Sequence, residues 1–191
     1  VTAVETFAAR ILTPALARLA ELHPEITIEL ITDVRSLSLA RREADIAIRL
    51  AAFEQHEAVV RRIADMAFGL YASPDYLGRY GLPNWSKGGA GHRLIMVQDS
   101  LASLPEAQWL HGLAPSLKPG LSANSRQVQV EACALGLGLA CLPRYLGDAA
   151  PQLQRLDTPS EPPRRGIWIG VHRDMRETPR IRVVLDSLAA Q

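Results

Sequence analysis

Apolar residues follow two different periods along the chain, and segments of the two kinds alternate. Segments that are apolar throughout or at every second position predict β-strands; they span residues 1–4, 26–31, 45–50, 67–73, 93–97, 119–123, 137–142 and 166–171. Helical segments are predicted over about residues 11–22, 36–42, 125–135 and 179–189, with a shorter one from residue 74. Strands that alternate with helices predict an α/β architecture with mostly parallel sheets.

The first long helix has an apolar face made by Ile11, Leu12, Leu16, Leu19 and Leu22. Pro14 cannot lie deep inside a helix, because it lacks a backbone N–H and its ring crowds the preceding turn. The regular part of this helix should therefore begin near Ile11 or kink there. His23 precedes Pro24, and a residue before proline is driven out of the α region, so the helix should end there.

Capping residues predict the ends of two other helices. Ser73 lies in an N-cap position before Pro74, and proline is favoured in the first helical turn. Ser125 should cap the helix over 125–135 in the same way. Gly136 should end that helix, because glycine adopts the left-handed conformation at little cost.

Composition narrows the class of protein. The 191 residues are 48% hydrophobic, enough for one large domain or two small ones with real cores. Lysine and arginine number 21 against 20 acidic residues, so charge gives no reason to expect a polyanion partner. No run of about 18 apolar residues occurs, so no membrane span is predicted. The chain begins at Val1 without a methionine, as a fragment or a processed product would.

Catalytic and metal-binding signatures are missing from the sequence. There is no P-loop, no His-Glu-x-x-His and no Gly-x-Ser-x-Gly. Asp33 and Asp45 could form a carboxylate pair of the kind used in acid–base catalysis, but Asp45, just before a buried strand, fits a structural role better. Cys133 and Cys141 have apolar neighbours and are predicted to be buried small hydrophobes rather than a redox pair. The expectation is no catalytic residue, no metal and no cofactor.

Polar residues gather where predicted strands end and helices begin. They are Thr6, the segment 32–36, and the pair Asn124 and Ser125. In doubly wound sheets, ligands bind at the carboxyl ends of the strands. Helix N-termini at these places offer unpaired N–H groups and a partial positive charge. The pattern favours a site for a small polar or anionic ligand.

Five motifs, in order along nearly the whole chain, resemble the effector-binding domain of LysR-type transcriptional regulators. They are Leu-Thr-Pro-Ala-Leu-Ala-Arg-Leu (12–19) with His-Pro-Glu-Ile-Thr-Ile-Glu-Leu (23–30), Glu-Ala-Asp-Ile-Ala-Ile-Arg (43–49), Tyr-Ala-Ser-Pro-Asp-Tyr-Leu (71–77), Gly-Leu-Gly-Leu-Ala-Cys-Leu-Pro (136–143), and His-Arg-Asp (172–174) before Pro-Arg-Ile-Arg (179–182).

The resemblance implies an α/β fold of the type 2 periplasmic-binding-protein-like class, with two Rossmann-like subdomains and an interdomain cleft. Subdomain I would take residues 1–70 and 169–191, and subdomain II residues 73–166. The hinge would then lie near 71–73 and 167–169.

The resemblance also implies which residues bind the effector, when the family's pocket is carried over onto matching positions. They are Thr6, Phe7, Asp33, Arg35, Ser36, Arg49, Asn124, Ser125 and Gln127. Arg35 or Arg49 could pair with a carboxylate on the ligand. Glu5 departs from the family, which often carries a small hydroxyl residue there, and an inward-pointing carboxylate would repel an anionic effector.

The function expected from the resemblance is that of a small-molecule-sensing domain in a cytoplasmic bacterial regulator, with no enzyme activity and no membrane partner. The winged helix-turn-helix that reads DNA in the family lies outside these residues, so DNA contact is expected only through it. A homodimer is expected, with the helix over 12–22 facing the helix over 125–135 of a second copy, and a tetramer for the whole protein. A periplasmic solute-binding protein and a small α/β enzyme remain as alternatives.

Overall fold

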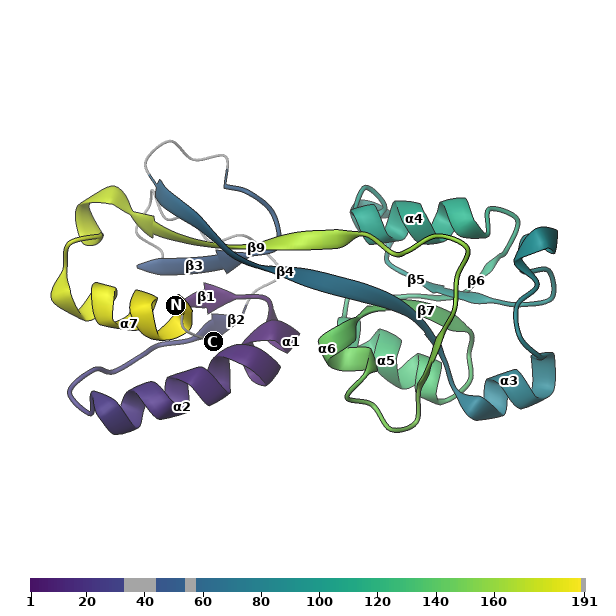
Figure 1. Cartoon of the computed structure of the whole chain (residues 1–191), viewed down its shortest axis with the longest axis horizontal. Helices are drawn as coiled ribbons and strands as arrows, with labels where there is room; N and C mark the ends of the chain where they lie inside the picture. The colour runs from purple at the N-terminus through teal and green to yellow at the C-terminus, as the bar shows by residue number, and fades with distance from the viewer. Residues whose placement is uncertain (33–43, 54–57, 190–191) are drawn as a thin grey trace. The chain divides into compact units, whose positions relative to one another are not determined.

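A computed structural model describes residues 1–32, 44–53 and 58–189 (Figure 1). The chain divides into two compact units: unit 1 is Val1–Asp65 with Gly166–Gln191, and unit 2 is Met66–Arg165. It passes between them within strand β4 (Ala58–Ala72) and again within strand β9 (Arg164–His172). The expected boundaries lay at 70–73 and 166–169. Both passages occur inside continuous strands, so no turn or loop marks them.

Unit 1 is built on a sheet with the order β2-β1-β3-β9. Strand β1 (Thr2–Ala3) lies between β2 (Ile31–Thr32) and β3 (Ile46–Arg49) and is parallel to both, while β9 runs antiparallel to β3. Ile46, Ala47 and Ile48 are all buried, because both faces of β3 are covered. A strand buried on both faces reads as a continuous apolar run, which is why its position could be predicted.

The first helical segment of unit 1 changes its geometry along its length. It comprises α1 (Glu5–Phe7), a π-helical turn (Ala8–Leu12) and α2 (Thr13–Leu22). The N–H of Thr13 reaches back five residues to the carbonyl of Ala8, and its hydroxyl donates to the same oxygen at 3.0 Å. The helical segment thus begins earlier than expected, at Glu5, and regular α-helix resumes at Thr13, one residue before Pro14, rather than near Ile11.

The apolar face of this helix differs from the predicted one. Leu12, Ala15 and Leu19 are buried, but Ile11 lies at the surface and Leu22 is 74% exposed. The π-helical turn inserts an extra residue before α2, so positions on either side of it do not share one face. The helix ends at His23 as predicted, with the His23 N–H donating to Leu19.

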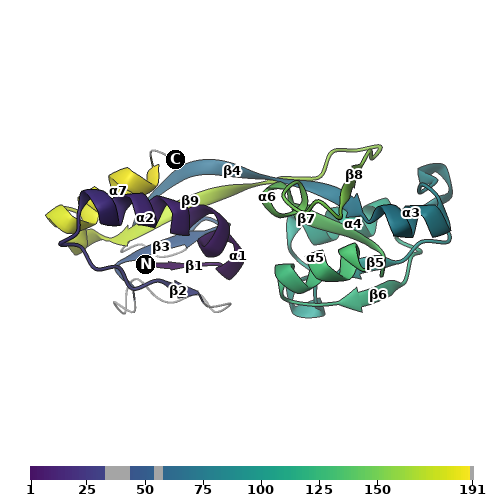
Figure 2. The same ribbon diagram turned by 90° about the horizontal axis from the view of Figure 1, so that it is seen from below.

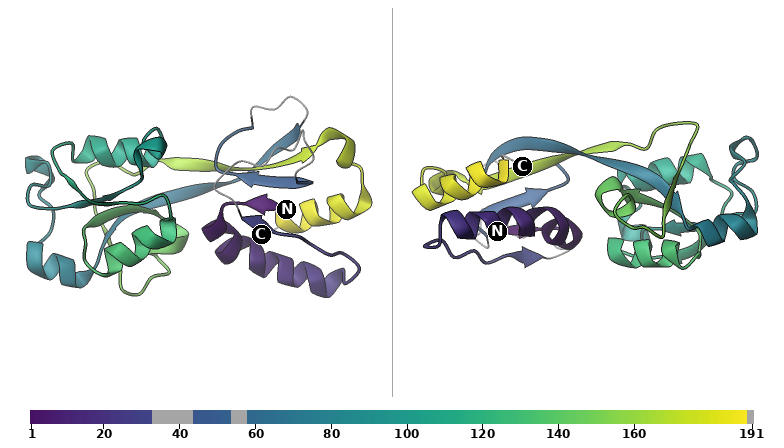
Figure 3. Two further views of the ribbon diagram at one scale, coloured as in Figure 1. Left: turned by 180° about the vertical axis from the view of Figure 1, so that it is seen from behind. Right: turned by 60° about the horizontal axis from the view of Figure 1, so that its bottom comes forward.

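Helix α7 (Pro179–Ala189) closes unit 1 and follows a 3-10 turn (Arg173–Met175). Figures 2 and 3 show α7 beside α2, and the two helices are in contact. Ile181, Val184 and Leu188 are the buried side of α7, and Leu185 is half-buried.

The strand predicted over 26–31 is mostly absent. Only Ile31 and Thr32 pair with β1, which is itself two residues long and so offers no further partners. The alternating pattern still governs burial over 26–30, where the apolar side chains are half-buried and Thr27 and Glu29 are exposed. The helix predicted over 36–42 lies outside the described residues.

Unit 2 has a second mixed sheet, in the order β8-β4-β7-β5-β6. The parallel strands are β5 (Leu94–Met96), β6 (Pro119–Ser122) and β7 (Leu139–Pro143); β4 is antiparallel to β7 and to β8 (Gln154–Leu156). Helix α4 (Pro105–Leu113) lies on one face and α5 (Arg126–Ala134) on the other (Figure 1). Shorter elements are α3 (Pro74–Tyr80), α6 (Arg144–Gly147) and 3-10 turns at Trp85–Lys87 and Asp99–Leu101.

The cap residues of unit 2 act as predicted. Ser73 accepts a hydrogen bond from the N–H of Tyr76 at 3.3 Å, and Ser125 accepts one from Val128 at 3.4 Å. Gly136 has a φ of 74° just after α5, in the left-handed region that glycine tolerates.

The α/β class is confirmed in both units. Among the described residues, no helix has the length and apolar character needed to cross a membrane.

Candidate functional site

The carboxyl ends of the parallel strands in unit 1 bring together three of the predicted binding residues. Thr6 and Phe7 lie in α1, directly after β1, and both are buried. Arg49 is the last residue of β3. β1 and β3 are parallel, and Thr2 of β1 lies opposite Ala47 of β3. Two residues further along both strands, Arg49 is level with Val4, the residue before α1. The predicted residues Asp33, Arg35 and Ser36 follow β2 and lie outside the described residues.

Arg49 is partly withdrawn from water at this edge. Its guanidinium carbon lies 4.6 Å from the centre of the Phe53 ring, a cation–π distance. Burial lowers the pKa of Arg49, although an arginine side chain keeps its charge in proteins. Glu5, the departure from the family, has an exposed side chain. The edge therefore presents a partly desolvated cation beside a buried threonine.

Unit 2 places a second set of predicted residues at the carboxyl end of β6. Asn124 is exposed, and Ser125 uses its hydroxyl to cap α5. Gln127 is directed elsewhere: its amide donates to Glu131 at 2.8 Å along the surface of the helix. Asn124 and Ser125 thus share the strand edge, whereas Gln127 belongs to the outer face of α5.

A buried polar network adjoins this edge, and the sequence did not reveal it. Glu106, 1% exposed, accepts hydrogen bonds from Arg126 and from Arg165, the latter at 3.1 Å. Arg126 also donates to Gln129 at 2.8 Å. Gln129 in turn donates to the carbonyls of Ala123 and Met96, at 2.7 and 3.3 Å. The network therefore fastens the carboxyl ends of β5 and β6 to the first turn of α5.

Two guanidinium groups of the network face the single carboxylate of Glu106. Burial lowers the pKa of Arg126, the charge of Glu106 raises it, and Arg165 lowers it again. Arg126 is the first residue of α5, so the network lies next to a helix N-terminus, which itself favours anions. Arg126 and Gln129 stand three residues apart, a helical spacing visible in the sequence, but Glu106 and Arg165 are distant along the chain. The contacts of Glu106 with the two arginines could not be inferred, because the helix α4 that carries Glu106 was not predicted.

The two cysteines are buried, as predicted. Burial raises the pKa of Cys133 and of Cys141 to about 12, which disfavours the reactive thiolate. The Cys133 thiol donates to the carbonyl of Tyr71 at 3.3 Å. Within the described ranges, no three histidine, cysteine or acidic side chains come together as they would around a metal ion.

Comparison with known proteins decides the family. The family described as the LysR substrate binding domain matches residues 1–191. The chain belongs to this family. The resemblance found in the sequence motifs is thereby confirmed, together with the periplasmic-binding-protein-like fold of the type 2 class.

Relatives of this LysR substrate binding domain are transcriptional regulators. The regulator CrgA of Neisseria meningitidis is 26% identical over 192 residues, covering 95% of this chain and 62% of CrgA. The Mau operon transcriptional activator of Paracoccus denitrificans is 32% identical over 196 residues, covering 98% and 62%. The chain thus spans about 62% of the length of these curated relatives. None of these relatives is a transporter's solute-binding protein, so the periplasmic alternative is not supported.

Solved structures agree with the fold. The regulatory domain of CrgA superposes with a TM-score of 0.83 at 26% identity, covering 99% of this chain and 95% of that one. The regulatory domain of AphB from Vibrio vulnificus gives a TM-score of 0.77 at 22% identity, covering 99% and 95%. At that identity, the second match supports the fold alone.

Proposed function

We propose that this domain binds a small-molecule effector for a bacterial LysR-type transcriptional regulator and catalyses no reaction. The observation that carries the proposal is the family match over all 191 residues. Its relatives CrgA and the Mau operon activator are regulators by name. The polar residues at the carboxyl ends of parallel strands supply the chemistry that effector binding needs.

The proposed effector is a small carboxylate or similar anion. Arg49 supplies a partly desolvated cation in unit 1, and the N-terminus of α5 at Ser125 and Arg126 favours anions in unit 2. Arginine recognises carboxylates through two parallel hydrogen bonds, which gives geometric selectivity. The proposed binding residues remain Thr6, Phe7, Asp33, Arg35, Ser36, Arg49, Asn124, Ser125 and Gln127, the last of which would have to exchange its hydrogen bond with Glu131 for one with the effector.

The whole regulator is proposed to work in the cytoplasm as a homodimer that forms tetramers, and to contact DNA only through a winged helix-turn-helix outside this domain. The effector changes the regulator's state only if it binds one conformation more tightly than another. Exposed apolar residues support pairing between copies through α2 and α5: Leu22 is 74% exposed, Val128 46% and Leu135 75%. This chain alone is expected to leave a promoter duplex unshifted at physiological salt.

A thermal-shift screen with small carboxylates, aromatic acids, amino acids and sugars tests the proposal. A ligand at 100 times its Kd adds about 2.7 kcal/mol of stability, or roughly 5–10 °C for a chain of this length. The shift should be lost in Arg49→Gln and reduced in Ser125→Ala, and kept in Arg180→Gln, an arginine on α7 away from both strand edges. A shift of equal size in all three variants would refute the proposed site.

A further inference from the structure

A pocket lies in unit 1, on the face of the sheet covered by α7. Its volume is about 470 Å³, within the range of roughly 300–1,000 Å³ typical of small-molecule sites. Val59 and Arg61 alternate along β4, and Ile169 and Val171 alternate along β9, so each pair directs its side chains to one face. None of the residues that line this pocket belongs to the predicted effector site.

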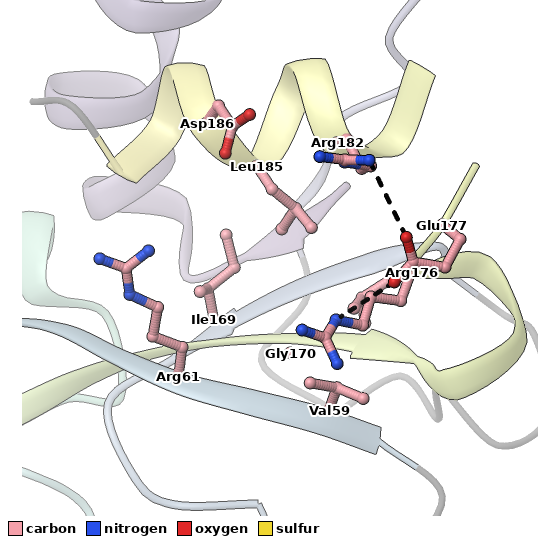
Figure 4. Close-up of a pocket in the computed structure, with 10 residues that line it drawn as sticks. Val59, Arg61, Ile169, Gly170, Arg176, Glu177, Arg182, Leu185 and Asp186 are labelled. Atoms are coloured by element: carbon pink, nitrogen blue, oxygen red, sulfur yellow. Dashed lines mark ion pairs between the residues drawn. The ribbon is translucent and has the colours of Figure 1, made fainter. Parts of the chain in front are cut away.

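Arginine side chains surround an apolar floor in this pocket. In Figure 4, Arg61 lies on one side of the space beside Ile169 and Leu185, and the guanidinium groups of Arg176 and Arg182 lie on the other side. Arg61 makes no ion pair or hydrogen bond with any described residue. A guanidinium that has no partner among the described residues and lies next to aliphatic side chains suits a ligand that has both an anionic group and an apolar body.

The other two arginines share one weak partner. Arg176 is 3.7 Å and Arg182 3.9 Å from the carboxylate of Glu177, whose side chain is 76% exposed. Exposed ion pairs of this kind contribute little to stability, so a ligand anion can replace Glu177 at small cost. Asp186 also lines the pocket, which leaves three positive and two negative side chains. A single negative charge on the ligand balances the remainder.

We propose that this pocket, named here the α7 pocket after the helix that covers it, binds a small organic monoanion with an apolar body. The site is separate from the proposed effector site, and only its influence on the effector response rests on the proposed function. Arg61 lies four residues before the passage of β4 into unit 2, and Ile169 lies three residues after the passage of β9 out of it. A ligand in the α7 pocket therefore contacts both strands that connect the units, which gives it a route to modulate the response to the effector.

Two-dimensional ¹H–¹⁵N NMR of the 191-residue chain tests the site directly, with benzoate as the probe and benzamide as its neutral counterpart. Benzoate should shift the backbone signals of Ile169, Gly170 and Val171, and benzamide should not. Arg61→Gln and Arg182→Gln should each weaken benzoate binding about tenfold, the size expected for a lost charged hydrogen bond. Arg180→Gln, on the same helix outside the α7 pocket, should leave binding unchanged.

Glu177→Gln provides a gain-of-function control, since it removes the carboxylate that competes with the ligand. It should tighten benzoate binding several-fold, a result that damage to the fold cannot produce. Equal shifts with benzamide, or unchanged binding in Arg61→Gln and Arg182→Gln, would overturn the proposal. Benzoate shifts confined to residues 4–7, Arg49 and Ser125 would also overturn it while supporting the effector site. If no compound in the effector screen binds at those strand edges while benzoate still shifts the signals of Ile169, Gly170 and Val171, only the proposed function is overturned.

Discussion

The buried carboxylate of Glu106 should be the most sensitive point of unit 2. It pairs with Arg126 and with Arg165, whose side chains are themselves largely shielded from water. Glu106→Gln keeps the size of the side chain but removes the carboxylate that both guanidinium groups contact. Removing one partner of a buried ion pair costs about 3–5 kcal/mol. The two arginines retain some exposure and can recover part of their hydration, so we expect about 3 kcal/mol, at the lower end.

Equilibrium unfolding in urea measures this loss. Trp85 and Trp109 lie in unit 2, where their indole N–H groups donate to the carbonyl of Asp157 and the hydroxyl of Ser160, while Trp168 lies in unit 1. In a Trp168→Phe background, tryptophan fluorescence therefore reports unit 2 alone. With a slope of about 2 kcal/mol per molar urea, the midpoint should fall by roughly 1.5 M.

Glu131→Gln is the matched control, because it makes the same chemical change on the exposed surface of α5. Its effect should stay within about 0.5 kcal/mol. The double variant Glu106→Gln/Arg165→Gln should lose less than the sum of its single variants, because one of the two cations is removed together with the carboxylate that it contacts. If Glu106→Gln costs no more than Glu131→Gln, the charge of Glu106 does not hold the network together and the reasoning is refuted.

Three further predictions concern other parts of the molecule. Burial lowers the pKa of His92, so the unfolded chain takes up this proton more readily than the folded domain. The domain should therefore lose stability as pH falls below the unfolded pKa of about 6.5. A His92→Gln variant should show a flatter dependence of Tm on pH between 7.5 and 5.5, about one unit either side of that value, and an unchanged slope would contradict this. Cys133 and Cys141 should resist a thiol-reactive dye at pH 8 in the folded domain and react on unfolding, since burial raises both pKa values to about 12; fast labelling of the folded protein would contradict their burial. Val128→Glu with Leu135→Glu should shift the sedimentation of the domain from dimer to monomer, and a wild-type domain that stays monomeric at high concentration would exclude this face as the contact.

Local signals in the sequence were sufficient for the central strands and the caps. β7 and the first three residues of β3 are apolar because they are buried on both faces, and the continuous apolar pattern alone locates them. Ser125 and Gly136 act through hydrogen bonds and backbone angles within a few residues, so their roles are readable without the fold. The family motifs are also short local segments, so their order along the chain was enough to show the resemblance.

Features that depend on contacts between residues distant in the sequence could not be predicted. The first half of β4 carries Arg61, Arg62 and Asp65, and its strand conformation is imposed by pairing rather than by an apolar pattern. Helix α4 buries only Ala107 and Leu110 as apolar residues besides Glu106, too few to establish a helical period. Both the Glu106 network and the α7 pocket are built on these elements, so neither could be inferred from sequence.

The near-neutral charge of the domain shapes how it can recognise an anion. Its net charge of +1 provides no long-range attraction, yet arginines gather around Glu106, and in the α7 pocket they outnumber the acidic side chains. Selectivity for an anion must then come from guanidinium groups held in position at short range rather than from a surrounding field. Partly buried pairs are screened much less by salt than exposed charges are. Binding of a small carboxylate should therefore weaken far less with rising salt than the binding of a polyanion, whose affinity falls steeply through counterion release.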